Sequence, residues 1–249
     1  MKNKLKNFLL KLSCTGTVTR VDTRQPCVAL TFDDGPNPAY TPQLLDILDK
    51  HQARATFFMV GGTAEQNKEL VSEVAARGHT IGNHSWDHPS FPALTGKQRR
   101  QQLRRCATAL VPHGQRLFRP PFGHQSLASR LDALWAGYEV IAWNVLAGDW
   151  RDWPAEKILA KLDCAVQPGN IILLHDGLFS AAQPSCLDRT PTLRAVDQLL
   201  SDHADYRFVT VPELFKCGRV VRQPWFRIGD RAWLEALKTE EVLRGEAEE

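Results

Sequence analysis

The sequence predicts an α/β fold in which parallel strands and crossover helices form a closed or nearly closed barrel. Short apolar runs alternate with helical patterns along the chain, which is typical of a parallel sheet. The chain has 249 residues, of which 43% are hydrophobic, and one α/β barrel commonly fills this size. Polar residues of catalytic types follow several of the apolar runs directly, at the end of the strand where barrel enzymes carry their active sites.

Seven strand-like runs are each followed by a helical pattern. Some boundaries are clear, because Pro154 suits the first turn of a helix and Gly78 suits a helix end. We find no internal repeat and no run long enough to cross a membrane. The expected strands and their helices are 28–32 with 41–51, 55–60 with 64–77, 80–83 with 96–110, 117–118 with 126–136, 139–143 with 154–165, 170–174 with 192–203, and 207–211 with 212–216.

Around this single domain, residues 26–216, we expect two short extensions. Residues 1–25 form a basic segment and a lead-in, and residues 217–249 either pack on the barrel or face a membrane. Residues 1–12 carry apolar residues at helical spacing opposite lysines, a pattern that can lie on an anionic membrane; a solvated terminus is the alternative. The apolar residues are Leu5, Phe8, Leu9 and Leu12.

Composition limits the location and the partners. Lys11 interrupts the first apolar run after three residues, so we expect no secretory signal and a cytoplasmic protein, with peripheral contact to the inner membrane face as an open hypothesis. The six cysteines show no metal-site or redox spacing and are expected to be thiols. A net charge of +3 is too small to indicate nucleic-acid binding. The oligomeric state is not indicated.

Two adjacent acids end the first apolar run. In Thr31–Phe32–Asp33–Asp34–Gly35–Pro36 the carboxylates follow a buried strand and precede a sharp turn. Side chains alternate along a strand, so the two carboxylates leave its end in different directions. One can therefore bind a metal while the other handles a proton.

Two histidines supply partners for that metal. His84 and His88 follow the strand expected at 80–83 and are four residues apart, within reach of one ion if the segment makes a helical turn. Two imidazoles and one carboxylate leave coordination positions open, as in catalytic zinc and iron sites. The pair alone is a weak signal, and it gains weight from Asp33 and Asp34.

Four motifs in order resemble those of the polysaccharide deacetylases, the NodB-homology enzymes of carbohydrate esterase family four. They are Thr-Phe-Asp-Asp-Gly-Pro at 31–36, His-Ser-Trp-Asp-His at 84–88, Arg-Pro-Pro-Phe-Gly at 119–123 and Leu-Leu-His-Asp at 173–176. The resemblance spans residues 26–216 and implies an irregular (β/α)7 barrel of parallel strands. It also implies a divalent metal, Zn²⁺ or alternatively Co²⁺.

By this resemblance each motif residue has an expected role. Asp34, His84 and His88 bind the metal; Asp33 is the general base for a metal-bound water, Arg119 orients it, and His175 is the general acid. Backbone NH groups near Phe122 and Gly123 assist the oxyanion. His124, Asp149 and Trp150 are further candidates for substrate contact, with Trp150 first as a sugar-stacking ring.

One motif of the family is incomplete. Its usual Asp-x-x-Asp-Trp keeps only Asp149 and Trp150, and Leu146 stands at the first acid, which supports the catalytic histidine in relatives. A carboxylate partner raises the pKa of a histidine and fixes its orientation. Asp149, Asp176 or Asp188 could replace the missing acid, and the sequence does not decide between them.

The function implied is removal of N-acetyl groups from an amino-sugar glycan or a glycan precursor, with a lipid-linked precursor as one alternative. Two closely related alternatives, O-acetyl ester hydrolysis and removal of another acyl group such as formyl, need the same residues. A barrel that binds glycan but has lost turnover is an alternative of another class, and Leu146 is the residue that raises it.

Overall fold

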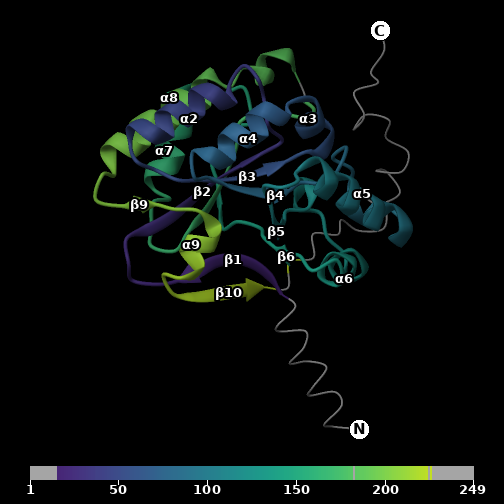
Figure 1. Ribbon diagram of the computed structural model, residues 1–249. Helices are drawn as coiled ribbons and strands as arrows, with labels where there is room; N and C mark the ends of the chain where they lie inside the picture. The colour runs from purple at the N-terminus through teal and green to yellow at the C-terminus, as the bar shows by residue number, and fades with distance from the viewer. Residues whose placement is uncertain (1–15, 182, 224, 226–249) are drawn as a thin grey trace.

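The computed structural model describes residues 16–181, 183–223 and 225. An eight-stranded sheet of parallel strands curls at the centre, and helices cover its outer side (Figure 1). The strand order is β6-β5-β4-β3-β2-β8-β7, with β9 paired to β2. The irregular (β/α)7 barrel expected for this chain is therefore confirmed.

The strands are short, and those at the centre are buried on both faces. The strand Cys27–Asp33 is wholly buried because it lies between two neighbouring strands and beneath helices. The strands are β2 Cys27–Asp33, β3 Thr56–Met59, β4 Thr80–Asn83, β5 Gly114–Phe118, β6 Glu139–Val140, β7 Val145–Leu146, β8 Ile171–His175 and β9 Arg207–Phe208.

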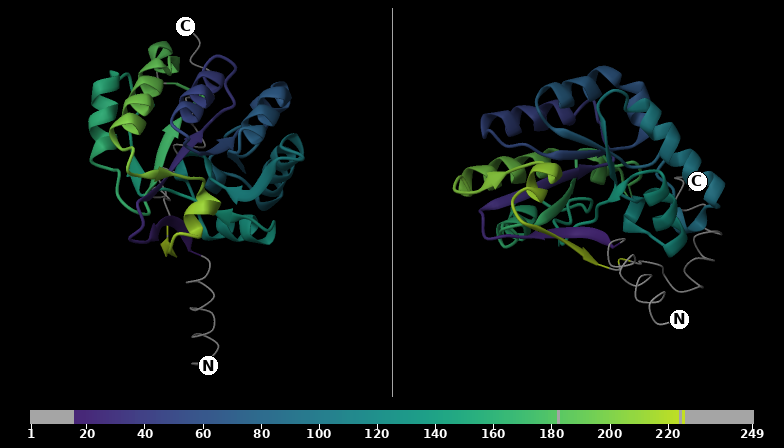
Figure 2. Two further views of the ribbon diagram at one scale, coloured as in Figure 1. Left: turned by 60° about the vertical axis from the view of Figure 1, so that its left-hand side comes forward. Right: turned by 60° about the horizontal axis from the view of Figure 1, so that its bottom comes forward.

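Helices follow most strands and surround them, as the left view of Figure 2 shows. Hydroxyl residues begin several of them, and Thr95, for example, accepts a hydrogen bond from the backbone of Gln98 in a capping box. The helices are α2 Thr41–Lys50, α3 Gly61–Gln66, α4 Lys68–Ala76, α5 Gly96–Ala109, α6 Leu127–Trp135, α7 Ala155–Asp163, α8 Thr190–Asp202 and α9 Val211–Phe215, with 3-10 turns η1 Phe91–Ala93, η2 Pro121–Gly123 and η3 Pro184–Leu187.

Several expected elements differ from the structure, and the strand expected at 117–118 begins earlier, at Gly114. The helix expected at 64–77 is two helices, α3 and α4, because Asn67 leaves helical geometry and its side chain donates to the carbonyl of Thr63 at 2.8 Å. The strand expected at 139–143 ends at Val140, and the sequence reading missed β7, which follows without a helix between. The strand expected at 207–211 is the two-residue β9.

A two-stranded ribbon crosses the open side of the barrel. β1 Thr17–Asp22 and β10 Arg219–Gln223 pair antiparallel, so segments near both ends of the chain lie side by side below the barrel in Figure 1. Val18 bridges Ile141, just after β6, and Arg20 bridges Asn170, just before β8. The ribbon therefore lies beside β6 at one end of the sheet and beside β8 near the other end, and its apolar side packs on the core through Val18, Val21 and Val220.

Among the described residues, no helix is long and apolar enough to cross a membrane. The amphipathic pattern expected at residues 1–12 lies outside the described residues. The part of the C-terminal extension beyond Trp225 also lies outside the described residues.

Candidate active site

The strand register brings the predicted polar residues to one edge of the sheet. Asp33 is the last residue of β2 and lies opposite His175, the last residue of β8. His84 directly follows β4, and Arg119 directly follows β5. Neighbouring parallel strands end together, so these four side chains meet at the carboxyl edge of the barrel.

Asp34, His84 and His88 form a group whose ligand atoms all lie within 4.8 Å of one another. The Oδ1 atom of Asp34 is 3.3 Å from Nε2 of His84 and 3.2 Å from Nε2 of His88. All three side chains are buried. Among the described residues, this is the group of acids, histidines and cysteines arranged to hold a metal ion.

The hydrogen bonds around the Asp-His-His group leave a ring nitrogen of His84 and a carboxylate oxygen of Asp34 able to bind a cation. Nδ1 of His84 lies 2.8 Å from the carbonyl oxygen of Arg119. A carbonyl oxygen can only accept a hydrogen bond, so Nδ1 carries the proton. In the neutral ring Nε2 therefore keeps a lone pair that can bind a cation. Asp34 accepts the amide of Phe179 on Oδ2 at 3.1 Å, and its buried Oδ1 has no hydrogen-bond donor within the described chain. Burial opposes the charge of Asp34, but the imidazoles of His88 and His84, in their protonated forms without a cation, outweigh burial and hold the pKa of Asp34 well below the usual range.

The backbone at these residues is held in a strained conformation. Asp34 has φ 73° and His88 has φ 56°, left-handed values that cost a residue with a Cβ about 1–2 kcal/mol. The segment from His84 to His88 is not the helical turn considered from the sequence, because Ser85 also has positive φ, at 70°. Instead, the Ser85 hydroxyl accepts the amide of His88 at 3.1 Å, and this turns the second imidazole toward Asp34.

Arg119 fixes the orientation of Asp33. Its guanidinium is completely buried and donates to Oδ1 of Asp33 at 2.7 Å, to the Thr31 hydroxyl at 2.7 Å and to the carbonyl of Ala142 at 3.0 Å. Burial lowers the pKa of Arg119, and the charge of Asp33 opposes that effect. The other oxygen of Asp33, Oδ2, lies 3.7 Å from Nε2 of His84 and therefore faces the Asp-His-His group.

Asp149 holds His175. Its Oδ2 accepts the backbone NH of His175 at 2.8 Å, and its Oδ1 lies 3.0 Å from Nδ1 of the ring. Burial disfavours the imidazolium, but Asp149, with smaller contributions from Asp34 and Asp33, outweighs it and raises the pKa of His175 to about 9. The histidine is thus protonated at neutral pH, with its Nε2 edge available to a substrate.

This arrangement resolves the question raised by Leu146. Of the three acids considered as replacements, Asp149 contacts the histidine, whereas Asp176 bonds to the Thr41 hydroxyl and Asp188 to Tyr40. The structure also corrects the substrate-binding role expected for Asp149, since its side chain is buried and both oxygens are used by His175.

The remaining predicted residues are divided between the mouth of the site and the protein interior. Phe122 and Trp150 are half-buried; the ring of Phe122 packs 4.5 Å from that of His88, and the ring of Trp150 lies 5.8 Å from that of His175. His124 is half-buried, with Nδ1 3.2 Å from the Ser90 hydroxyl. These three can be reached from solvent.

Gly123 lies deeper, and its backbone groups are already bonded. Its NH donates to the carbonyl of Pro120 at 2.9 Å, and its carbonyl accepts Nε1 of Trp225 at 3.1 Å. A Cβ at this position would lie 2.7 Å from the ring of Trp143, and φ is +68°. Gly123 therefore shapes the turn, which corrects the expectation that it contacts substrate.

Sequence reasoning missed Phe179, and it considered Asp176 only as a partner for His175. Phe179 donates its amide to Asp34, and Asp176 places its carboxylate where a Cβ of Gly35 would lie, beside the metal group. Phe179 is in an irregular segment after β8 without periodicity, so only its closeness in sequence to His175 could have indicated it.

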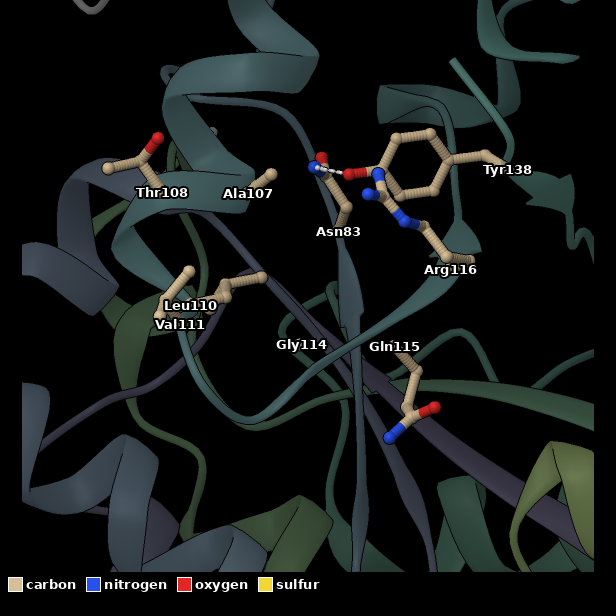
Figure 3. Close-up of a pocket in the computed structure, with 9 residues that line it drawn as sticks. All are labelled: Asn83, Ala107, Thr108, Leu110, Val111, Gly114, Gln115, Arg116 and Tyr138. Carbon is tan, nitrogen blue, oxygen red and sulfur yellow. Dashed lines mark hydrogen bonds between the residues drawn. The ribbon is translucent and has the colours of Figure 1, made fainter. Parts of the chain in front are cut away.

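A separate cavity of about 220 Å³ lies on another side of the barrel. Figure 3 shows Asn83 and Tyr138 joined by a hydrogen bond of 3.1 Å in its wall, with Arg116 beside them. None of the candidate catalytic side chains is among the residues that line it. The chemistry is therefore assigned to the strand edge rather than to this cavity.

Comparison with known proteins agrees with the geometry. Residues 20–141 match the polysaccharide deacetylase family profile. The chain is 36% identical over 215 residues to a peptidoglycan-N-acetylglucosamine deacetylase of Bacillus cereus, covering 83% of this chain and 96% of the relative. It is 34% identical to a chitooligosaccharide deacetylase of Sinorhizobium fredii, covering 78% and 93%.

A solved structure gives the same result. The fold superposes on the Bc1960 peptidoglycan N-acetylglucosamine deacetylase with a TM-score of 0.72 at 29% identity, covering 82% of this chain and 94% of that one. Sequence identity over nearly the whole length of the relatives, the shared barrel and the Asp-His-His group together lead to one conclusion. The chain belongs to the polysaccharide deacetylase family.

Proposed function

We propose that this protein is a metal-dependent hydrolase that removes N-acetyl groups from an amino-sugar glycan. The observation that carries the proposal is the placement of a base, an acid and a three-residue cation group around one point at the edge of the barrel. The relatives named as deacetylases of N-acetylglucosamine-containing glycans and chitooligosaccharides support the substrate class.

The residues fit a divalent cation, and we propose Zn²⁺, with Co²⁺ as a substitute. Two imidazole nitrogens and one carboxylate oxygen from Asp34, His84 and His88 are a typical catalytic zinc set that leaves positions open. The lone pair on Nε2 of His84 and the unbonded Oδ1 of Asp34 support this assignment. When bound, such an ion acidifies water and polarises a carbonyl group.

The protein's own groups supply the proton transfers. Asp33, held by Arg119, accepts the proton of the attacking water. His175, protonated and oriented by Asp149, donates a proton to the departing nitrogen, which is a poor leaving group without it. Among the described residues, no hydrogen bond occupies the backbone NH of Phe122, so this NH can donate to the developing oxyanion.

The direct test is acetate release from chitooligosaccharides by protein loaded with Zn²⁺ or Co²⁺, with new amine measured in parallel. We expect equal amounts of acetate and amine. Asp33→Asn should reduce the rate by about 10²–10⁴-fold, the usual contribution of a general base. Asp87→Asn is the matched control, because Asp87 is an exposed acid between His84 and His88 in sequence.

The same assay separates the alternatives. Acetate without a new amine, from an O-acetylated sugar, would indicate an esterase, and formate from a formylated sugar would indicate a deformylase. Oligosaccharide binding with a loaded metal site but no product at any pH would indicate a barrel without turnover, and would refute the proposal.

A further inference from the structure

We propose that Phe179 is a specificity-determining residue whose ring packs against the apolar face of a substrate sugar. This inference rests on the proposed function, because it places the sugar beside the acyl group that reacts. Phe179 follows β8 and lies four residues beyond His175. Its backbone NH donates to Oδ2 of Asp34 at 3.1 Å, which fixes the residue beside the cation group.

The ring of Phe179 is both close to the chemistry and open to solvent. Its centroid lies 5.4 Å from that of His88, and Phe122 packs against the same imidazole at 4.5 Å. Phe179 is 44% exposed, whereas Phe122 is half-buried. Two aromatic rings thus flank His88, and the ring of Phe179 extends from the protein at the mouth of the site.

The exposure of a single phenylalanine is ordinary on a protein surface. The position of Phe179 is different, because a main-chain hydrogen bond to a candidate metal ligand places the ring. Within the described chain, Trp135 is the other large exposed aromatic side chain, and no ring contact joins it to the Asp-His-His group. An aromatic face next to a deacetylation site matches the C–H face of a pyranose ring.

The experiment compares Phe179→Ala with Phe179→Tyr, which keeps the aromatic face. Both variants keep the backbone NH that donates to Asp34. Leu187→Ala is the matched control, since Leu187 is 48% exposed in the same segment. The steady-state constants are measured on an N-acetylglucosamine pentamer, and its dissociation constant is measured by calorimetry in a His175→Ala background. Zinc content and melting temperature are recorded for every variant.

We expect Phe179→Ala to raise KM and the dissociation constant about 5–10-fold, with kcat within about twofold of the unsubstituted protein. Phe179→Tyr and Leu187→Ala should match the unsubstituted protein. Unchanged binding in Phe179→Ala, equal loss in Phe179→Tyr, or a fall in zinc content that accounts for the loss would overturn the inference. Pentamer binding that depends on Phe179 without any acetate release would refute the proposed function and support this inference; a protein that neither binds nor cleaves the pentamer would overturn both.

A second and independent observation concerns two thiols. Cys27, the first residue of β2, and Cys217, just before β10, have their sulfur atoms 3.1 Å apart, although no disulfide joins them. The guanidinium of Arg207 lies 2.9 Å from the first sulfur and 3.9 Å from the second. Burial and Cys27 raise the pKa of Cys217 to about 11, and Arg207 opposes this effect.

The geometry points to a disulfide site between Cys27 and Cys217, formed by exchange with a small disulfide such as oxidised glutathione. The two thiols lose two protons and two electrons as their S–S bond forms, and the glutathione disulfide is reduced to two thiols. Cys217 is partly exposed beside an open cavity lined by residues 22–25, through which a small disulfide can approach. The bond would tie the ribbon of β1 and β10 to the first strand of the barrel.

Oxidation with glutathione disulfide, followed by intact-mass analysis and a non-reducing peptide map, tests this site. We expect the loss of two hydrogens, a Cys27–Cys217 crosslink and a melting temperature higher by about 5–15 °C. Cys164→Ser, which removes an exposed thiol, should behave the same, and Cys217→Ser should form no crosslink. No crosslink in the oxidised protein, or a crosslink between other cysteines, would overturn the inference.

Discussion

Replacing Asp149 by asparagine removes the charge that keeps His175 protonated while keeping the shape of the side chain. Asp149 uses one oxygen for the backbone NH of His175 at 2.8 Å and the other for Nδ1 at 3.0 Å. The pKa of His175 is raised to about 9 by this acid against the opposing effect of burial. Without the charge, burial acts with less opposition and the pKa falls.

The size of the effect follows from titration. An opposite charge at hydrogen-bond distance shifts a pKa by about 1–3 units, and a loss of about 2 units corresponds to about 2.7 kcal/mol. At pH 8 the protonated fraction of His175 would fall from about nine-tenths to about one-tenth. Both forms of the protein remain mostly protonated at pH 6. The pH-dependent part of the loss should therefore be about tenfold at pH 8 and less than about twofold at pH 6. The amide keeps only one acceptor oxygen for the two NH groups of His175, which adds a loss common to both pH values.

The assay is the pH dependence of kcat/KM for acetate release between pH 5 and about pH 10. The alkaline limb should move to lower pH in Asp149→Asn and stay in place in Asp152→Asn, an exposed acid three residues away. An unchanged alkaline limb, or a loss of rate that is equal at every pH, would refute the assignment of His175 as the acid held by Asp149.

Two further outcomes follow from buried charges. Arg119→Lys should lower kcat by about 10–100-fold and destabilise the protein by about 3–5 kcal/mol, because lysine cannot replace the donors to Asp33 and Ala142. Arg116→Lys, at an exposed arginine in β5, the strand that Arg119 follows, should change neither value in acetate and urea-denaturation assays. Asp176→Asn should stabilise the fold at pH 8 by about 1–3 kcal/mol in thermal denaturation, and by less at pH 5. Burial raises the pKa of Asp176 from 3.8 to about 7, so the protonated carboxyl that suits the folded protein is lost as pH rises through 7, and the folded protein is destabilised. Equal stability of the two proteins at pH 8 would contradict this reasoning.

The sequence predicted the helices and strands that can be recognised from their own residues alone. Strands such as β2 and β3 are mostly apolar because both of their faces are buried, so they stand out without any knowledge of their partners. In contrast, β7 has two residues and is a strand only because it pairs with β8. The division at Asn67 was also hidden, since it depends on a side-chain hydrogen bond rather than on glycine or proline.

The same distinction applies to the site. Asp33 ends β2, and Asp34 and His84 directly follow strand ends. Parallel register brings strand ends together, so the meeting of these side chains could be predicted. The partner of His175 could not be chosen from the sequence, because the path of the segment between β7 and α7 decides which acid reaches the ring. The role of Phe179 depends on a main-chain hydrogen bond, which residue types do not reveal.

The most direct measurement is the zinc content of the protein after loading and exhaustive dialysis, by mass spectrometry of the metal, in the unsubstituted chain and in Asp34→Asn and His84→Ala. His113→Ala, a half-buried histidine away from the group, is the control. We expect about one ion per chain in the unsubstituted protein and the control, and a near-complete loss in the two variants. Equal zinc in Asp34→Asn, or no retained ion in the unsubstituted protein, would contradict it.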